Sequence, residues 1–123
     1  MRKFRLIAVA AILLAVPSVA WSRSETALRA YLHNCQTEGV DPDVRIDACS
    51  ALIHGNIVSH GILAAFYLYR ANAYAEKHDY DDALKDYDKA LELKTDFPEA
   101  QANRAAVADR VQPPSPPPAV TRQ

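Results

Sequence analysis

Apolar side chains recur every three or four residues from Ser22 to Val111, and no stretch of useful length alternates between apolar and polar residues. The clearest run lies between Tyr80 and Leu91, where apolar residues occupy positions i, i+3, i+4 and i+7. A half-buried strand would require a period of two residues instead. The spacing therefore predicts an all-α fold.

Helix-capping signals divide this region into five expected helices. The first begins with the capping box Ser22-x-x-Glu25 and stops at Gly39, since glycine tolerates the left-handed backbone of a helix end. The second begins at Asp41-Pro42, an N-cap followed by a proline in the first turn, and ends near Gly55. The other three are expected from Ser59 to about Lys77, from Asp79 onward, and from the box Asp96-x-x-Glu99 to about Val111. Their short connections predict antiparallel neighbours.

The helical domain is expected to span residues 22–111, because both ends of the chain have a different character. Residues 1–20 combine a basic start, an apolar run from Leu6 to Val16 and small residues before Ala20. This pattern predicts a signal peptide that is cleaved after Ala20, or alternatively after Ser22. The apolar run is short for a hydrocarbon core of ~30 Å, which argues against the alternative of an uncleaved anchor. Residues 112–123 are rich in proline and predict a disordered tail.

The charge balance and the cysteines restrict the class of protein further. The chain has 14 basic and 15 acidic residues, and loss of residues 1–20 removes three basic ones, which leaves a net charge of −4. Without a basic cluster, nucleic acid and anionic membrane surfaces are not expected partners. Cys35 and Cys49 are a single pair, and an even number in an exported chain favours a structural disulfide. Their spacing is not that of a CxxC redox motif.

One segment carries a repeat motif. Its spaced residues are Tyr67-x2-Arg70-Ala71-x2-Tyr74, then Ala83-x3-Tyr87, then Ala90. This pattern resembles the tetratricopeptide (TPR) repeat, a 34-residue unit that folds as two helices joined by a turn. Arg104-Ala105 follows Arg70-Ala71 at the same period, and Arg45-Ile46-x2-Cys49 aligns with Ala83-Leu84-x2-Tyr87. Three positions depart from the family pattern: Arg70 replaces Leu, His78 replaces Gly in the turn, and Thr95 replaces the closing Pro.

The resemblance implies a short, all-α, TPR-like solenoid of stacked antiparallel hairpins, with about two and a half repeats. In the central hairpin, Ala71 and Ala83 would allow close approach of the two helices. Exported bacterial TPR proteins show a similar layout of a cysteine pair, which implies a disulfide between the helices of the first hairpin. About three repeats are normally needed for stability, so this bridge, or self-association through the Ala-rich last helix, is expected to compensate.

Two ion pairs are expected within the central hairpin. Arg70 is placed to pair with Asp86 across the hairpin, as a structural contact. Asp81 and Lys85 are placed as an i, i+4 pair along one helix. Most of the remaining charge is expected to cover a solvated outer helix.

The resemblance also implies a function. TPR proteins bind other proteins or peptides on a concave surface that is lined by the first helix of each repeat. The residues expected on this surface are Leu68, Tyr69, Asn72, Glu76, Asn103 and Arg110. Asn72 and Asn103 match asparagines with which such grooves hold a peptide backbone. The expected protein is thus a non-enzymatic, cofactor-free binding protein in the periplasm or outside the cell.

Enzymatic and metal-dependent functions find little support in the sequence. It has no Gly-rich phosphate loop, nucleophile elbow or HExxH motif. The histidines do not form a helical ligand pair, and the acidic run that starts at Asp79 lacks the glycine and the terminal Glu of a calcium loop. Two alternatives stay open: a thiol-redox or metal-handling protein that uses Cys35, Cys49 and histidines, and a signal-anchored subunit of a membrane complex.

Overall fold

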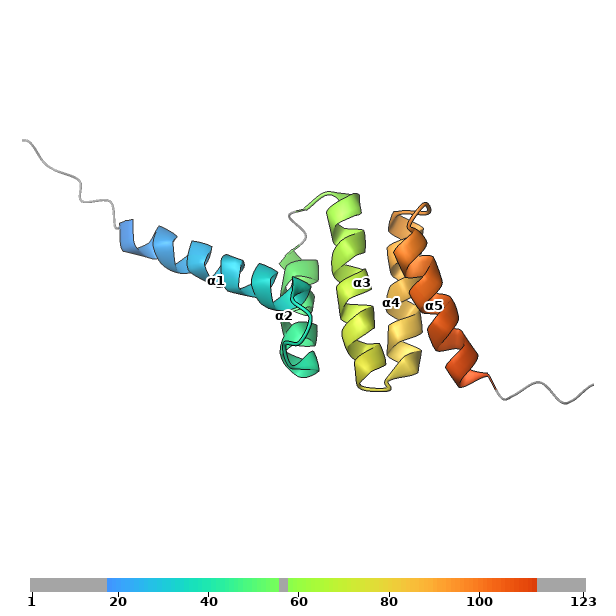
Figure 1. Cartoon of the computed structure of the whole chain (residues 1–123). Helices are drawn as coiled ribbons and strands as arrows, with labels where there is room; N and C mark the ends of the chain where they lie inside the picture. The colour runs from blue at the N-terminus through green and yellow to red at the C-terminus, as the bar shows by residue number, and fades with distance from the viewer. Residues whose placement is uncertain (1–17, 56–57, 113–123) are drawn as a thin grey trace, which may run out of the picture.

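The computed structural model describes residues 18–55 and 58–112, with side chains from Arg23 onward. These residues form five helices: α1 (Ser18–Gln36), α2 (Pro42–Gly55), α3 (His60–Glu76), α4 (Tyr80–Leu93) and α5 (Pro98–Val111). The predicted all-α fold is confirmed for this part of the chain (Figure 1). Most of the expected signal peptide and all but the first residue of the expected tail lie outside the described residues.

The helices stack in two layers. Each helix packs against its neighbours in the chain, and α3 also contacts α1 and α5. Helices α1, α3 and α5 therefore form a front layer, while α2 and α4 form a back layer, as in a short solenoid of hairpins. Figure 1 shows α2, α3, α4 and α5 side by side, with α1 running away from the stack at one end. The predicted solenoid of antiparallel hairpins is thus confirmed.

Two of the expected helix starts are wrong. Helix α1 begins at Ser18, so Ser22 lies inside it rather than at its cap. No proline or glycine interrupts the chain between these two residues, and the helix extends upstream past the capping signal. Helix α5 has Phe97 as its N-cap and Pro98 in its first turn, so Asp96 lies one position too early. Proline fixes the backbone angle required at the first helical position, which sets the start there.

The other boundary predictions are confirmed, except that α1 ends at Gln36, before the expected stop at Gly39. The carboxylate of Asp41 accepts hydrogen bonds from the backbone N–H groups of Asp43, at 2.9 Å, and Val44, at 3.3 Å. Gly39, shortly after α1, has φ +84°, the left-handed conformation expected of a stop. Ser59 and Asp79 occupy the N-cap positions of α3 and α4, although neither side chain makes a capping hydrogen bond.

The α3–α4 hairpin is held by small side chains at the helix contact. Ala71, Ala83 and Ala90 are fully buried, and the ring of Tyr87 is almost completely buried between them. This confirms that alanines allow the close approach of the two helices. The contact continues into α5 through Ala100 and Val107, which belong to the same apolar cluster.

A second apolar cluster surrounds the predicted disulfide, which the structure confirms. Cys35 on α1 and Cys49 on α2 are bonded, with their Sγ atoms 2.12 Å apart, and both residues are fully buried. Leu52 and Phe66 complete the cluster and connect it to α3. Closing a loop of this length stabilises a fold by roughly 3 kcal/mol in a chain-entropy description.

The ion pairs of the hairpin are confirmed in one case and wrong in the other. Arg70 donates to both carboxylate oxygens of Asp86, at 2.6 and 2.8 Å, and also to the hydroxyl of Ser50 at 2.9 Å. Lys85, however, pairs with Asp82 at 2.8 Å rather than with Asp81. Residues three and four positions away both neighbour a helical side chain, so an exposed lysine has two competing partners here.

Arg45 is an unexpected buried cation. It occupies the place in α2 that aligns with Ala83 in α4, yet its side chain is almost completely buried. Its guanidinium donates to Glu76 on α3 at 2.5 Å, while its Nε has no hydrogen-bond partner among the described residues. At this helix contact, a long side chain thus takes the position of a small one. The guanidinium of Arg45 reaches the front layer, where it pairs with Glu76 on α3.

Candidate functional site

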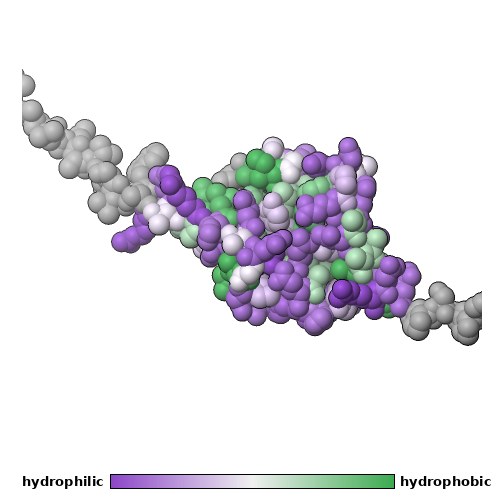
Figure 2. All heavy atoms as spheres, viewed as in Figure 1, coloured by the Kyte–Doolittle hydropathy of each residue, from purple (hydrophilic) through white to green (hydrophobic). Residues whose placement is uncertain are grey.

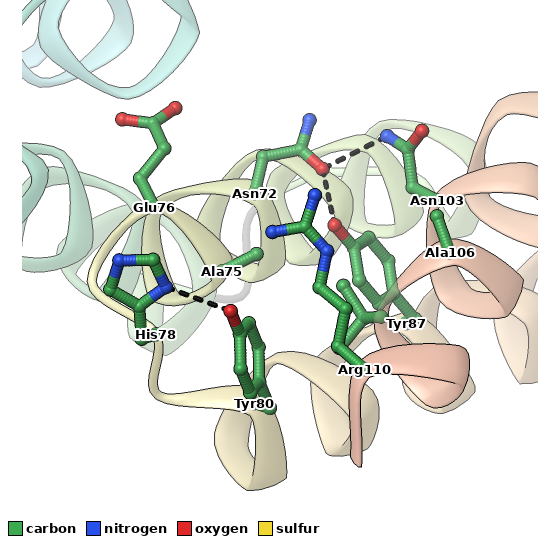
Figure 3. A pocket seen from close by; sticks show the side chains of 10 residues that line it. Asn72, Ala75, Glu76, His78, Tyr80, Tyr87, Asn103, Ala106 and Arg110 are labelled. Carbon is green, nitrogen blue, oxygen red and sulfur yellow. Dashed lines mark hydrogen bonds between the residues drawn. The ribbon is translucent and has the colours of Figure 1, made fainter. Parts of the chain in front are cut away.

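Helices α3 and α5 border a hollow of about 330 Å³ on the front layer (Figure 3). Its wall is mixed in character, with amide, aromatic, aliphatic and charged side chains. The residues that line it are Asn72, Ala75, Glu76, His78, Tyr80, Tyr87, Asn103, Ala106, Val107 and Arg110. The α3–α4 hairpin supplies most of them, and α5 closes the opposite side.

Two asparagines and a tyrosine form a hydrogen-bonded row across this hollow. The Oδ1 atom of Asn72 accepts a hydrogen bond from the hydroxyl of Tyr87 at 2.6 Å and a second from Nδ2 of Asn103 at 3.0 Å. Three helices are thereby joined, since Asn72 lies on α3, Tyr87 on α4 and Asn103 on α5. Figure 3 shows both contacts at the wall of the hollow. We call these three residues the amide row.

The amide row leaves complementary polar groups for a ligand. With Oδ1 of Asn72 occupied, its Nδ2 group has hydrogens to donate, and Oδ1 of Asn103 has lone pairs to accept. One donor next to one acceptor matches the C=O and N–H of a peptide backbone. Because the row is fixed by its internal hydrogen bonds, little side-chain entropy remains to be lost when a ligand binds.

Tyr87 keeps its proton throughout the physiological range. Burial, reinforced by the negative charges of Glu76 and Glu99, raises the pKa of Tyr87 to about 12. Its hydroxyl therefore remains a donor, which directs the lone pairs of Asn72 toward it and fixes the orientation of the amide.

Charged groups lie around the rim of the hollow. Glu76 is held by its ion pair with the buried Arg45, while Figure 3 shows the guanidinium of Arg110 extending from α5 over the hollow toward Asn72. His78 lies in the α3–α4 turn with φ +64°, the conformation expected where the family pattern prefers glycine. Its Nδ1 atom is 2.7 Å from the hydroxyl of Tyr80, which keeps both rings at the rim.

Four of the six residues expected on the binding surface line this hollow: Asn72, Glu76, Asn103 and Arg110. Leu68 does not, because it is buried in the α3–α4–α5 cluster, so its place on the binding surface was wrong. One helical turn before Asn72, neighbouring helices cover this face of α3 completely. Tyr69 is half-buried and packs against the disulfide cluster, on another side of the helix.

The sequence did not identify Tyr87 as part of the site, since it was expected only as a residue of the repeat motif. Its hydroxyl organises the amide row, and one signal for this was available. The family pattern has Phe at this position, whereas this chain has Tyr, and a buried phenol requires a hydrogen-bond partner. His78 was expected only as a turn residue, and Tyr80 only as the start of the apolar run between Tyr80 and Leu91.

Other parts of the described structure bear on the alternative functions. The disulfide is fully buried, so neither a thiol reagent nor a partner disulfide can reach its sulfur atoms directly in the folded chain. Within residues 18–55 and 58–112, no three His, Cys, Asp or Glu side chains converge as metal ligands do. None of the helices described there has the length and apolar character that a membrane crossing needs.

The comparison with known families identifies the central hairpin. The family model of the tetratricopeptide repeat matches residues 64–97, which include α4, most of α3 and the turn between them. Neither a curated protein nor a solved structure gives a significant match to the chain.

Proposed function

The chain contains a tetratricopeptide repeat at residues 64–97, and from this premise we propose that it is an adaptor that binds an extended peptide segment of another protein. Repeats of this family mediate contacts between proteins and are generally non-catalytic. The binding surface is the hollow between α3 and α5, and the amide row is its specific element.

The amide row is the observation that carries this proposal. It presents a donor and an acceptor from two helices to a space of about 330 Å³ that opens to solvent. An extended peptide supplies alternating acceptors and donors along its backbone, so one residue of the ligand would satisfy both groups. The proposed contact is therefore independent of ligand side chains.

The remaining wall restricts which side chains such a peptide carries. Ala75, Ala106 and Val107 offer small apolar contacts. Glu76 and Arg110 lie at the rim with opposite charges, so a ligand with residues of both signs is favoured over a uniformly charged one. We therefore assign to the hollow a short segment with an apolar residue between polar neighbours.

The proposed place of action is the periplasm or the extracellular space, in the form without residues 1–20. The basic start and the apolar run of this segment support export, and a buried structural disulfide suits an oxidising compartment. A catalytic role is not part of the proposal.

A library of random extended peptides displayed on phage tests the binding surface. Ala106→Arg places a long side chain in the hollow and leaves the three residues of the amide row in the sequence, whereas Ala105→Arg, its neighbour outside the hollow, serves as the matched control. Sequences selected by the wild-type protein should lose at least tenfold in affinity for Ala106→Arg and keep it for Ala105→Arg.

Asn72→Ala combined with Asn103→Ala tests the amide row itself. The double variant should lose binding to all selected peptides to a similar extent, because the contact is to the backbone. Thermal melting of each variant shows that the fold persists. If the double variant binds as the wild type does, or if the library yields no ligand, the proposed site is wrong.

A further inference from the structure

Helix α5 repeats part of α3, but within residues 18–55 and 58–112 it lacks the covering that α3 has. Arg104-Ala105 follows Arg70-Ala71 at the repeat period. Ala71 is fully buried beneath α4, and the side chain of Arg70 is 15% exposed. Ala105, in contrast, is exposed, and the side chain of Arg104 is 42% exposed. The face of α5 that contains Arg104 and Ala105, here called the outer α5 face, thus has no helix on it within the described residues.

The ion pairs show which side of α5 is uncovered. Arg70 bridges two back helices, because it contacts Ser50 on α2, which precedes α3, and Asp86 on α4, which follows it. Arg104 contacts Asp88 on α4, the back helix that precedes α5, at 2.5 Å. The second half of the pattern, a following back helix, is not present among the described residues.

Helix α1 carries a segment that resembles the helix covering α3. The residues Ala27-Leu28-Arg29-x-Tyr31 repeat Ala83-Leu84-Lys85-x-Tyr87 of α4, with one basic residue exchanged for another. In α4 the alanine and tyrosine are buried against α3, whereas Leu28 and Tyr31 of α1 are 39% and 44% exposed. We call Ala27–Tyr31 the α1 segment.

The surroundings of the α1 segment leave it incompletely packed. Leu28 and Tyr31 border an apolar hollow of about 210 Å³ between α1, α2 and α3 instead of closing onto these helices. Figure 1 shows that α1 extends away from the stack, and Figure 2 shows apolar residues at the surface where it leaves. Contiguous apolar side chains at a protein surface are a feature of interaction sites.

The α1 segment and the outer α5 face lie at opposite ends of the stack, so they cannot meet within one chain (Figure 1). We propose that α1 of one copy docks antiparallel on the outer α5 face of a second copy and supplies the back helix that this face lacks among the described residues. The occupant is a second copy because this chain itself carries the residues that cover the same face in its α3–α4 hairpin.

The charges agree with this arrangement. When α5 is aligned with α3 and α1 with α4, Asp109 corresponds to Ala75 and Arg23 to Asp79, at the two sides of the hairpin turn. Both side chains are exposed, and antiparallel docking brings them together with opposite charges. The contact also continues the α3–α5 and α4–α5 packing of the stack, so it extends an interface that already exists in the fold.

A contact between two different surfaces is heterologous. After pairing, one copy still has an unused α1 segment and the other an unused outer α5 face, so association proceeds beyond a dimer to a ring or an open row. A symmetric contact between two α1 helices would instead stop at the dimer, which distinguishes the two arrangements.

Sedimentation velocity of the full chain, as cells process it, tests the proposal. The weight-average mass should rise with concentration and pass that of a dimer. Ala105→Arg blocks the outer α5 face and Tyr31→Asp blocks the α1 segment, so each variant alone should be a monomer. An equimolar mixture of the two should form a dimer that grows no further, because each variant retains the surface that the other has lost.

Charge reversal provides a second test that does not depend on apolar packing. Asp109→Arg should weaken association at least fivefold, and Arg23→Asp in the same chain should restore it. A wild-type protein that stays monomeric up to millimolar concentration, a mixture that stays monomeric, or a double reversal without recovery overturns the proposal. A dimer abolished by Tyr31→Asp but unaffected by Ala105→Arg shows the symmetric α1 contact instead and overturns it as well.

Discussion

Arg70 lies where three helices meet, and its charge is satisfied on two sides. Both oxygens of Asp86 accept its hydrogen bonds from α4, and Ser50 accepts one from α2. The hydrogen bond with Asp86 raises the pKa of Arg70, although burial opposes it. The family pattern has an apolar residue at this position. Arg70 is always charged, and it can occupy this packing position because both carboxylate oxygens of Asp86 accept its hydrogen bonds.

Removal of Asp86 should therefore be costly. Asp86→Ala leaves the guanidinium of Arg70 without its carboxylate in a largely buried position, and we expect the free energy of unfolding to fall by roughly 3 kcal/mol. Glu92→Ala is the matched control, since it breaks the exposed pair with Lys89 and should cost less than about 1 kcal/mol. Urea unfolding of both variants measures the difference. Equal losses would contradict a special role for the Arg70–Asp86 pair.

Tyr87 should make stability depend on alkaline pH. The pKa of Tyr87 is about 12 in the folded chain and near 10 when unfolded, so the folded state binds the phenolic proton more tightly. The contribution of the protonated phenol to the free energy of unfolding is complete below pH 10 and is lost as the pH rises toward 12. Between pH 9.5 and 11.5, the wild type should lose roughly 1–2 kcal/mol more than Tyr87→Phe, as measured by urea unfolding. Parallel losses in the two proteins would show that this phenol is not protected.

Among the elements, the α3–α4 hairpin was the most predictable and α1 the least. Ala71, Ala83 and Tyr87 act within one local hairpin, where spacing alone determines which side chains meet. Arg45 could not be placed in this way, because its burial depends on Glu76, which lies far along the chain on another helix. Local signals likewise missed the extension of α1 to Ser18, since the capping box considers only one turn.

The same limit applies to the candidate site. Helical spacing brought Asn72 and Asn103 to one layer, but their mutual hydrogen bond requires the relative shift of α3 and α5. That shift is determined by packing through Ala100 and Val107, which no sequence motif describes. Leu68 was wrongly expected on the binding surface for the same reason. Residue spacing predicts which face of a helix a side chain lies on, but the neighbouring helices determine which part of that face is exposed to solvent.

The disulfide connects α1, most of whose described side chains are exposed, to the stack. Cys35→Ala combined with Cys49→Ala should lower the free energy of unfolding by roughly 3 kcal/mol, because the loop between the cysteines gains freedom in the unfolded chain. Thermal melting measures the loss, and amide hydrogen exchange should show faster exchange in α1 than in α3 or α4. Because the bridge is buried, the wild type is reduced in urea and refolded in the presence of reductant; this should lower its melting temperature and leave the double variant unchanged. An unchanged wild-type melt would remove the stabilising role of the bridge.

At the scale of the whole molecule, the two proposed contacts use separate surfaces, the front layer for the peptide and the two ends of the stack for a second copy. Ala106 lines the hollow, whereas its neighbour Ala105 lies on the outer α5 face, so one helix contributes to both surfaces without sharing a residue. Association of copies through α1 and α5 would place several amide rows on one assembly. A partner with repeated peptide segments would then bind more tightly than any single segment.

Export is a property of the whole chain as it is synthesised, and it can be tested at the N-terminus. We expect cleavage after Ala20, which makes Trp21 the first residue and leaves a net charge of −4. Because α1 is continuous from Ser18 to Gln36, the peptide bond after Ala20 lies within a helix of the full chain. A protease needs this bond in an extended form, so processing should precede the folding of α1. N-terminal sequencing of the form in the periplasmic fraction of a Gram-negative host measures the outcome. Ala20→Arg removes the small residue required for cleavage and should leave the uncleaved chain with the membrane, whereas a wild-type chain that keeps Met1 in the membrane fraction would establish the anchored alternative.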